Sequence, residues 1–403
     1  MTSNALAAGS GSVNGFGTQD RLVNRENIFL FIGFVVLAAY PAVDLLFGRT
    51  RLGALEGILV YVILALGLNV VVGYAGLLDL GYAAFFAIGA YTMGFLTSPA
   101  SYFIRKGWIP EILQHFWVAL AVSWVVAVFF GVLLGAPTLR LRGDYLAIVT
   151  LGFGEIVPNF FRNAKGLTGG IAGINRIDTP TEFSILGQHF AFNASNQRNW
   201  YWLMLLIGML SLLMIRRFYN SRLGRTWAAI REDEIAAASM GVNLVKTKLW
   251  AFALGASFAG FAGSIWSAAF QIVTPDQFEF SVSITILAMV ILGGLGNIYG
   301  VVVGAFLIGI FDRILAEELT RPLNWFGEQV GVSVLANHSV TSDRFLVFGL
   351  ALVLMMLLKP AGLISSARRK AEMAPDEESI RVHEQQQMYD IHNQEEPVEG
   401  DRA

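Results

Sequence analysis

The chain has 403 residues, of which 55% are hydrophobic and 14% are charged, with a formal net charge of −2. An ordinary soluble domain carries roughly 25% charged residues, so a soluble fold of this length would lack the polar surface that it needs. The near-neutral charge, without a basic patch, gives no basis for nucleic-acid binding. Because the chain contains no cysteine, disulfides, thiolate metal sites and a cysteine nucleophile are excluded.

Apolar segments long enough to cross a membrane recur along most of the sequence. A spanning helix needs about 20 mostly apolar residues, and the hydropathy pattern predicts about ten such spans. We therefore expect an all-α, polytopic membrane helix bundle in residues 27–360, between disordered polar tails at 1–26 and 361–403. The expected spans are 27–47, 55–72, 77–97, 117–137, 145–162, 199–215, 247–270, 282–296, 298–318 and 344–358.

The distribution of Lys and Arg predicts which side of the membrane the loops face. An even number of spans places both termini on the same side, and the positive-inside rule assigns the more basic loops to the cytoplasm. Lys and Arg concentrate between Arg216 and Lys248, so we expect this segment and both termini to be cytoplasmic. Arg49 and Arg51 then fall on the outer side, against the rule.

Two stretches predict helices that are interrupted by glycine. The first runs from Gly73 to Gly76, and the second includes Gly293, Gly294 and Gly296. Glycine lets helices pack closely in a membrane, which is the favoured interpretation of each glycine taken singly. Alternatively, a discontinuous helix exposes backbone groups that can bind a carboxylate or an ammonium group. We expect at least one of the two interruptions to lie on a substrate pathway.

The polar segment 221–241 predicts a short amphipathic helix on the cytoplasmic side. Leu223, Trp227 and Ile230 recur at helical spacing along one side of it, and Gly241 stands where a left-handed C-terminal cap is wanted. Such a helix suits a groove in another protein. It suits equally a membrane surface, with its arginines at the lipid headgroups. The pattern alone does not decide between the two.

This segment resembles the coupling loop of ATP-binding-cassette (ABC) importers, in which Glu-Ala-Ala is followed after three residues by Gly. Ala236, Ala237 and Gly241 match that pattern, whereas Ile235 stands at the Glu position and Glu234 lies one place earlier. The surrounding string is similar to the permeases of branched-chain amino-acid ABC transporters of the LivM type, where this shifted form is usual. Further stretches that carry the resemblance, in the same order, are Gly73–Tyr91, Arg142–Glu155, Gly166–Gly170 and Ile291–Gly300.

The resemblance covers roughly residues 55–360 and implies a transport subunit of the inner membrane, without cofactor, metal or enzymatic activity of its own. It implies a heterodimer with a sister permease, two ABC ATPase subunits, and a periplasmic binding protein that delivers leucine, isoleucine or valine. The long outer loop 163–198 is then either a set of turns or the landing site of that binding protein. The residues implied to couple transport to the ATPase are Arg231, Glu234, Ala236, Ala237 and Gly241.

Three alternatives to a branched-chain amino-acid importer stay open. Urea and short-amide ABC permeases belong to the same superfamily, but they usually carry a cation where this chain has Leu295. An ATP-independent channel and a membrane-embedded enzyme belong to other classes. The sequence contains no Gly-x-x-x-x-Gly-Lys-Ser/Thr loop for ATP, and its five histidines lack metal-ligand spacing.

Ionisable residues within spans are costly and are functional candidates by default. Asp79 either contacts the substrate ammonium or lies in the cytoplasmic headgroup layer, and the second interpretation is favoured. Glu155, two turns before Arg162, is interpreted as pairing with a neighbouring helix, while a role in the pathway stays open. Asp44 and Glu56 lie near outer helix ends and are interpreted as solvated. The pathway candidates are Gly73, Gly76, Asp79, Glu155, Gly293, Gly294 and Gly296.

Overall fold

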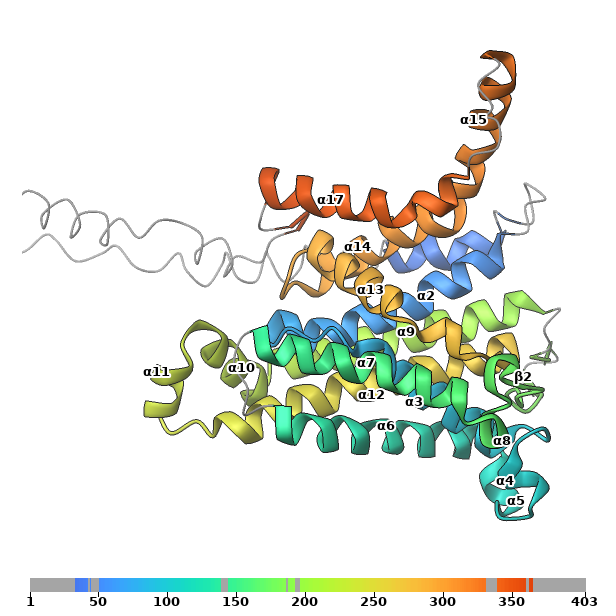
Figure 1. The fold of residues 1–403 in the computed structure, drawn as a ribbon, viewed down its shortest axis with the longest axis horizontal. Helices are drawn as coiled ribbons and strands as arrows, with labels where there is room; N and C mark the ends of the chain where they lie inside the picture. Colours follow the sequence, from blue (N-terminus) through green and yellow to red (C-terminus); the bar gives the residue numbers. More distant parts are fainter. Residues whose placement is uncertain are drawn as a thin grey trace, which may run out of the picture.

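The fold is known from a computed structural model. It describes residues 33–42, 44, 51–138, 144–185, 188–192, 196–330, 339–359 and 362–364. The two predicted tails lie outside the described residues, except for 362–364. The described chain is almost entirely helical, so the predicted all-α membrane bundle is confirmed (Figure 1).

The bundle consists of long helices joined by short ones. The long helices are α2 (Leu52–Leu68), α3 (Tyr82–Thr97), α6 (Phe116–Thr138), α7 (Asp144–Asn163), α9 (Gln197–Tyr219), α12 (Leu244–Phe270), α13 (Phe280–Gly293), α14 (Ile298–Ile310), α15 (Ala316–Val330) and α17 (Arg344–Leu358). The short helices are α4 (Tyr102–Arg105), α5 (Glu111–Gln114), α8 (Lys165–Thr168), α10 (Arg222–Glu232) and α11 (Glu234–Ser239). Gly33–Ala42 is a further short apolar helix.

Other regular elements are few. Two π-helices, η1 (Asn69–Tyr74) and η4 (Phe311–Leu315), continue α2 and α14, and 3-10 turns occur at η2 (Gly170–Ala172), η3 (Pro275–Phe278) and η5 (Val340–Asp343). The strands are β1 (Ile174–Asn175), β2 (Phe183–Ile185), β3 (Gln188–Phe190) and β4 (Ile272–Val273). They form two antiparallel pairs, β1 with β4 and β2 with β3.

The centre of the bundle is formed by α2, α3 and α12, because most of their apolar length is buried within the chain itself. Helix α12 packs against α2, α3 and α6. The contacts are made through small residues: a Cβ on Gly89 would come within 2.0 Å of the Gly260 carbonyl oxygen, and a Cβ on Gly260 would come within 2.1 Å of the Ala127 Cβ. Small residues of this kind let membrane helices approach closely, which compensates for the lack of a hydrophobic driving force between them in lipid.

Eight helical segments of the described chain are long and apolar enough to cross a membrane. The predicted count of about ten is not confirmed in the described chain, because two of the expected spans differ from the rest. The segment expected at 27–47 is described only in part, as Gly33–Ala42. The segment expected at 145–162 is present as the 20-residue helix α7, but this helix is not among the eight apolar segments.

Both predicted interruptions are confirmed. The first spanning helix changes from α2 to the π-helix η1 and ends at Tyr74, so residues 75–81 run without helix to the start of α3. The second interruption separates α13 from α14, with positive φ at Gly294 (119°) and Gly296 (81°). Glycine tolerates these angles because it has no Cβ.

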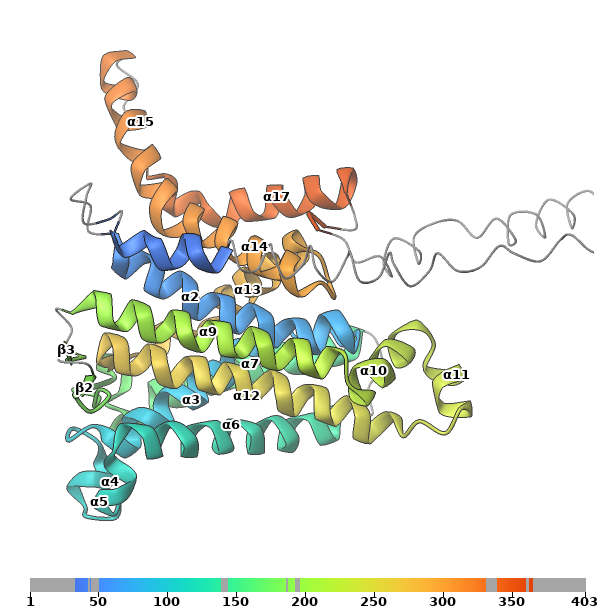
Figure 2. The ribbon, with the colours of Figure 1, turned by 180° about the vertical axis from the view of Figure 1, so that it is seen from behind.

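The two ends of the bundle differ (Figures 1 and 2). Helices α10 and α11 project from one end, while α4, α5, α8 and the β2–β3 pair gather at the other. The predicted glycine turns of the loop 163–198 are present, since Gly169, Gly170 and Gly173 all have positive φ. Strand β1 of this loop pairs with β4, which fixes the loop to the chain that follows α12.

The expectation that Asp44 and Glu56 are solvated is wrong. Asp44 is 8% exposed, and its carboxylate accepts a hydrogen bond from the Arg51 backbone N–H at 3.5 Å. Glu56 is 5% exposed, and its Oε1 atom has no hydrogen-bond partner among the described residues. Sequence position placed both near helix ends, but neighbouring helices cover these ends, and a hydropathy pattern does not contain that information.

The close approach of α12 and α6 can be tested with Gly260→Val. The added side chain must displace the Ala127 contact, and overpacking of this kind costs about 1–3 kcal/mol. We expect a lower midpoint of thermal unfolding for the purified protein in detergent. Gly208→Ala on α9 is the matched control, because a Cβ there meets nothing within 4 Å. Equal midpoints for the two variants would contradict this packing.

Candidate functional site

The segment 221–241 forms two helices where the sequence predicted one. Helix α10 ends at Glu232 and α11 begins at Glu234, with Asp233 between them in an extended conformation. The Asp233 carboxylate accepts hydrogen bonds from the backbone N–H groups of Ile235 (2.7 Å) and Ala236 (3.0 Å). An aspartate that caps a new helix N-terminus ends the preceding helix, and this local competition explains the difference from the prediction.

Helix α10 is attached to the start of α12. The indole N–H of Trp227 donates to the Thr247 carbonyl oxygen at 2.8 Å, and the Trp227 side chain is fully buried. Lys248, itself 5% exposed, forms an ion pair with Glu234. Trp227 and Ile230 therefore lie against the chain's own helices. The sequence pattern predicted that this apolar stripe contacts a partner protein or the membrane. In the structure, its residues Trp227 and Ile230 instead pack against other helices of the same chain.

Helix α11 exposes a different set of apolar residues. Ile235 is 75% exposed and Met240 is 86% exposed, while Ala237 is buried. The chain then turns at Gly241, whose φ of 85° confirms the predicted left-handed cap. A Cβ at Gly241 would meet nothing within 4 Å, so the backbone angle alone requires glycine there. The surface available to a partner at this end is thus the tip formed by α11.

The two glycine interruptions meet each other, although they lie far apart in the sequence. The side-chain oxygen of Asn69 accepts a hydrogen bond from the Gly296 N–H at 2.9 Å, across 227 residues of chain. A Cβ at Gly73 would lie 2.0 Å from that same oxygen and 2.7 Å from the Gly296 nitrogen. Only glycine at position 73 leaves room for this contact.

Arg231 of α10 joins this meeting point. Its Nη1 atom donates to the Gly73 carbonyl oxygen at 2.6 Å. The same guanidinium lies beside Gly296, where a Cβ would come within 3.0 Å of Nη1. A charge-assisted bond to a carbonyl is stronger than a neutral one. We call the set Asn69, Gly73, Arg231 and Gly296 the junction; it connects the projecting segment with both interrupted helices.

A cavity of about 470 Å³ lies beside the junction. Gly76 borders it with a φ of 69°, and a Cβ there would lie 3.1 Å from the Arg231 Cγ. Gly293 is used differently: a Cβ there would come within 2.2 Å of the Gly300 carbonyl oxygen, so it serves the packing of α13 on α14. The cavity is lined by Val72, Ala75, Gly76, Leu78, Ile230, Arg231, Glu232, Glu234 and Leu295.

Sequence reasoning missed Asn69, Ile235 and Met240. Asn69 carried a usable signal, because it is a polar residue inside the apolar segment Leu52–Tyr74 and lies one helical turn before Gly73. Ile235 and Met240 carried none, because an apolar residue in an amphipathic segment is normally assigned to the buried side.

Asp79, which the favoured interpretation placed in the cytoplasmic headgroup layer, is covered by the chain's own residues. It belongs to the non-helical segment between two spanning helices and is 2% exposed. Its Oδ1 atom accepts the Gly81 N–H at 2.9 Å, while Oδ2 has no partner among the described residues. Burial raises the pKa of the Asp79 carboxyl to about 6, and the hydrogen bond from Gly81 opposes that rise. The carboxyl holds the turn that precedes α3.

Glu155 lies on an exposed side of α7, and the expected pairing with a neighbouring helix is not found among the described residues. Arg162 of the same helix has other partners, since it forms ion pairs with Asp276 (2.7 Å) and Glu279 (3.3 Å) near the start of α13. Within the described chain, no group of three or more His, Asp or Glu residues is placed to hold a metal ion.

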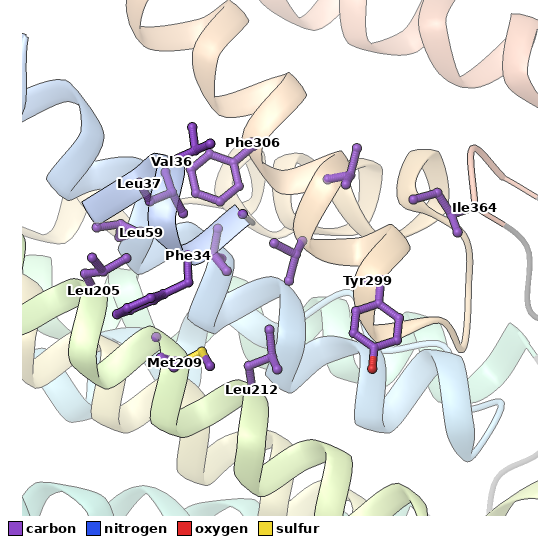
Figure 3. A pocket seen from close by; sticks show the side chains of 15 residues that line it. Phe34, Val36, Leu37, Leu59, Leu205, Met209, Leu212, Tyr299, Phe306 and Ile364 are labelled. Atoms are coloured by element: carbon purple, nitrogen blue, oxygen red, sulfur yellow. The ribbon is translucent and has the colours of Figure 1, made fainter. Parts of the chain in front are cut away.

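A second hollow is an apolar groove of about 390 Å³ between Gly33–Ala42, α2, α9 and α14 (Figure 3). The Phe34 ring lies near Met209 of α9, Phe306 of α14 lies near Val36 and Leu37, and Tyr299 borders the groove farther along α14. Its lining among the described residues is uncharged.

The helices long and apolar enough to span a membrane indicate a polytopic membrane protein. Spanning helices that are interrupted by glycine are a common feature of the transporter class. The chain belongs to the family described as branched-chain amino acid transport system / permease component, whose family model matches residues 50–332. The resemblance read from the sequence is thereby confirmed.

Individual relatives agree with this family. The high-affinity branched-chain amino acid transport system permease proteins LivM of Salmonella typhimurium and of Escherichia coli are each 37% identical to the chain over 369 residues. These matches cover 87% of this chain and 77% of each relative. LivH of Escherichia coli, a permease protein with the same system description, is 22% identical over 315 residues, covering 75% of this chain. No solved structure matches the chain.

The contribution of Asn69 to the junction can be tested with Asn69→Ala. This change removes the acceptor of the Gly296 N–H and leaves a buried donor without its partner, which costs roughly 1–3 kcal/mol. We expect a lower unfolding midpoint in detergent. Asn220→Ala at the exposed end of α9 is the control and should leave the midpoint unchanged. An unchanged midpoint for Asn69→Ala would show that the bond does not hold the interruptions together.

Proposed function

We propose that this chain is the permease subunit of an ABC importer that carries leucine, isoleucine and valine across the inner membrane. The observation that carries the proposal is the 37% identity to two LivM permeases over 87% of the chain. The chain's own residues fit the role, because the cavity at the helix interruptions combines apolar side chains with the charged groups of Arg231, Glu232 and Glu234. Such surroundings suit zwitterions with aliphatic side chains.

The partners are a sister permease, two ABC ATPase subunits and a periplasmic binding protein. The match to LivH as well as LivM supports a partner permease that is itself related to this chain. The exposed tip of α11, with Ile235 and Met240, is the surface that seats in the ATPase. The opposite end, with α4, α5, α8 and β2–β3, receives the binding protein. Both termini and α11 are then cytoplasmic, in agreement with the basic segment 216–248.

ATP hydrolysis by the partner subunits would reach the pathway through the junction. When the ATPase subunits close, α11 and α10 move together, because the ion pair of Glu234 with Lys248 and the bond from Trp227 hold them to α12. Arg231 transmits that movement to Gly73 and Gly296, since it contacts both interruptions. Backbone at such interruptions can change conformation without breaking a continuous helix.

Arg231→Ala should uncouple the transporter. Hydrogen bonds to charged groups contribute about 1.5–3 kcal/mol. If the Arg231 bond is present in only one of the transporter's two conformations, its loss changes the population ratio of these conformations by about tenfold or more. We expect leucine uptake into proteoliposomes that hold the complete transporter to fall by about this factor, with ATP hydrolysis retained.

Arg225→Ala on the same helix is the matched control for Arg231. Arg225 donates only to the neighbouring Asn220 carbonyl oxygen among the bonds described, at 3.3 Å on the exposed side. Uptake should stay within twofold or so of wild type. Parallel loss of uptake and hydrolysis in Arg231→Ala would instead indicate failed assembly and contradict the coupling role.

The substrate class is tested by competition. Cells that lack the gene should lose uptake of labelled leucine and regain it with the gene restored. Unlabelled isoleucine and valine should compete, because the transported group shares an ammonium, a carboxylate and an aliphatic side chain. Urea should not compete. Restored uptake of labelled urea, without uptake of leucine, would move the chain to the amide branch of the superfamily.

A further inference from the structure

Helix α7 differs from the other long helices of the described bundle. With 20 residues it is long enough to span a membrane, yet it is absent from the eight apolar segments. One side packs on α3, where Phe153 contacts Phe85 and Phe161 stacks on Tyr91 at 3.8 Å between ring centroids. In Figure 1, α7 lies on the front of the bundle, with no labelled helix in front of it.

The uncovered side of α7 has a polar stripe. Its polar members recur once per helical turn, and apolar residues flank them. Ile148, Ile156 and Phe160 are 62%, 66% and 58% exposed. Ile156 and Phe160, together with polar residues of the stripe, also border a surface hollow of about 570 Å³. The polar stripe consists of Glu155, Asn159 and Asn163, all exposed, and the exposed Gly152 lies one turn before Glu155.

Among the polar side chains of this stripe, the Glu155 carboxylate has no hydrogen-bond partner in the described part of the chain. The side-chain N–H groups of Asn159 and Asn163 donate to backbone carbonyls one turn earlier, at 2.9 and 2.8 Å. The Glu155 carboxylate forms no hydrogen bond or ion pair with the described residues, and Arg162 is engaged by Asp276 and Glu279. Glu155 lies about midway along α7, so an ionised carboxylate there would face the centre of the bilayer.

Helix α6 provides a comparison, because most of its apolar length is not buried within the described chain. Its strongly exposed large residues are all apolar, namely Trp117, Trp124, Val125, Phe129 and Leu133. An uncompensated charge facing lipid is costly, and intramembrane ionisable residues normally face a water-filled cavity or a partner. An ionised Glu155 would therefore need water or a partner protein against the exposed side of α7, whereas the exposed side of α6 carries no charged residue with such a need.

A related partner permease determines where such a face would lie. Two subunits of one fold pair most simply about a two-fold or approximate two-fold axis, so that equivalent surfaces meet. The similarity of this chain to both LivM and LivH supports such a pair of related subunits. A polar stripe on each subunit would then enclose a hydrated path between them.

We propose that the exposed stripe of α7 lines the substrate pathway between the two permeases, and that the Glu155 carboxylate binds the ammonium group of the transported amino acid. Ile156 and Phe160 contact its aliphatic side chain. This assignment rests on the proposed function. It adds a residue that recognises a cation, which a neutral amide does not carry, and so it gives the site a chemical preference for amino acids.

The absence of cysteine from the chain makes the pathway directly testable in the assembled transporter. Asn159→Cys is treated with a water-soluble, charged thiol reagent and separately with a lipid-soluble maleimide. Phe129→Cys on the exposed side of α6 is the matched control. We expect Asn159→Cys to react with the water-soluble reagent and Phe129→Cys to react with the lipid-soluble one only. Leucine, supplied with the binding protein and ATP, should slow the reaction at position 159.

The role of Glu155 is tested by Glu155→Gln and Glu155→Asp. Loss of a charge-assisted hydrogen bond to the ammonium should raise the leucine concentration for half-maximal uptake by about tenfold in Glu155→Gln. The conservative Glu155→Asp variant should recover part of that loss. Co-purification with the sister permease and the ATPases establishes that both variants assemble.

The overturning results are distinct from a failure of the proposed function. If Asn159→Cys reacts only with the lipid-soluble reagent, or with neither reagent, while leucine import persists, the pathway assignment is wrong by itself. A different result would overturn only the role of Glu155. In that result the water-soluble reagent labels position 159, leucine does not slow the labelling, and the leucine concentration for half-maximal uptake is unchanged in Glu155→Gln. If leucine is not imported at all, the proposed function fails, whereas the labelling pattern of the two cysteines still tests the hydrated face.

Discussion

The structure depends on one constraint: backbone groups released by an interrupted helix inside a membrane need partners from elsewhere in the chain. At the junction, the Gly73 carbonyl and the Gly296 N–H are such groups, and they are satisfied by Arg231 and Asn69. Glycine is required at position 73 because any side chain would displace the Asn69 oxygen. The two interruptions, which look like separate packing features in the sequence, are therefore parts of one polar contact.

This constraint also explains why the projecting segment is built as it is. Arg231 reaches Gly73 only because α10 is held against α12 by Trp227, whose indole bonds the Thr247 carbonyl. The apolar stripe of α10 is buried in this attachment. The apolar surface exposed at this end is therefore that of Ile235 in α11 and of Met240 directly after it. One short segment thus has an inner helix that belongs to the bundle and an outer helix that is available to a partner.

Three acidic residues of the bundle, Glu56, Asp79 and Glu155, differ in what surrounds them. Glu56 and Asp79 are buried among the chain's own helices, and the hydrogen bond from Gly81 to Asp79 stabilises a turn. Glu155 lies instead on an exposed side of α7. Hydropathy gives all three the same weight, because it records only that a charge interrupts an apolar segment. The covering helices decide whether such a charge is structural or is offered to something outside the chain.

The sequence by itself determined the helical membrane bundle, both interruptions, the left-handed turn at Gly241 and the family, because these follow from local composition, glycine geometry and contiguous motifs. Tertiary structure alone decided that Asn69 meets Gly296 across 227 residues, that Asp233 divides the projecting segment, and which side of α7 is uncovered. The physical reason is that the partner of a backbone group, or the burial of a side chain, depends on which helices lie beside it. Helix periodicity specifies faces within one helix, and only the packed bundle specifies which faces meet.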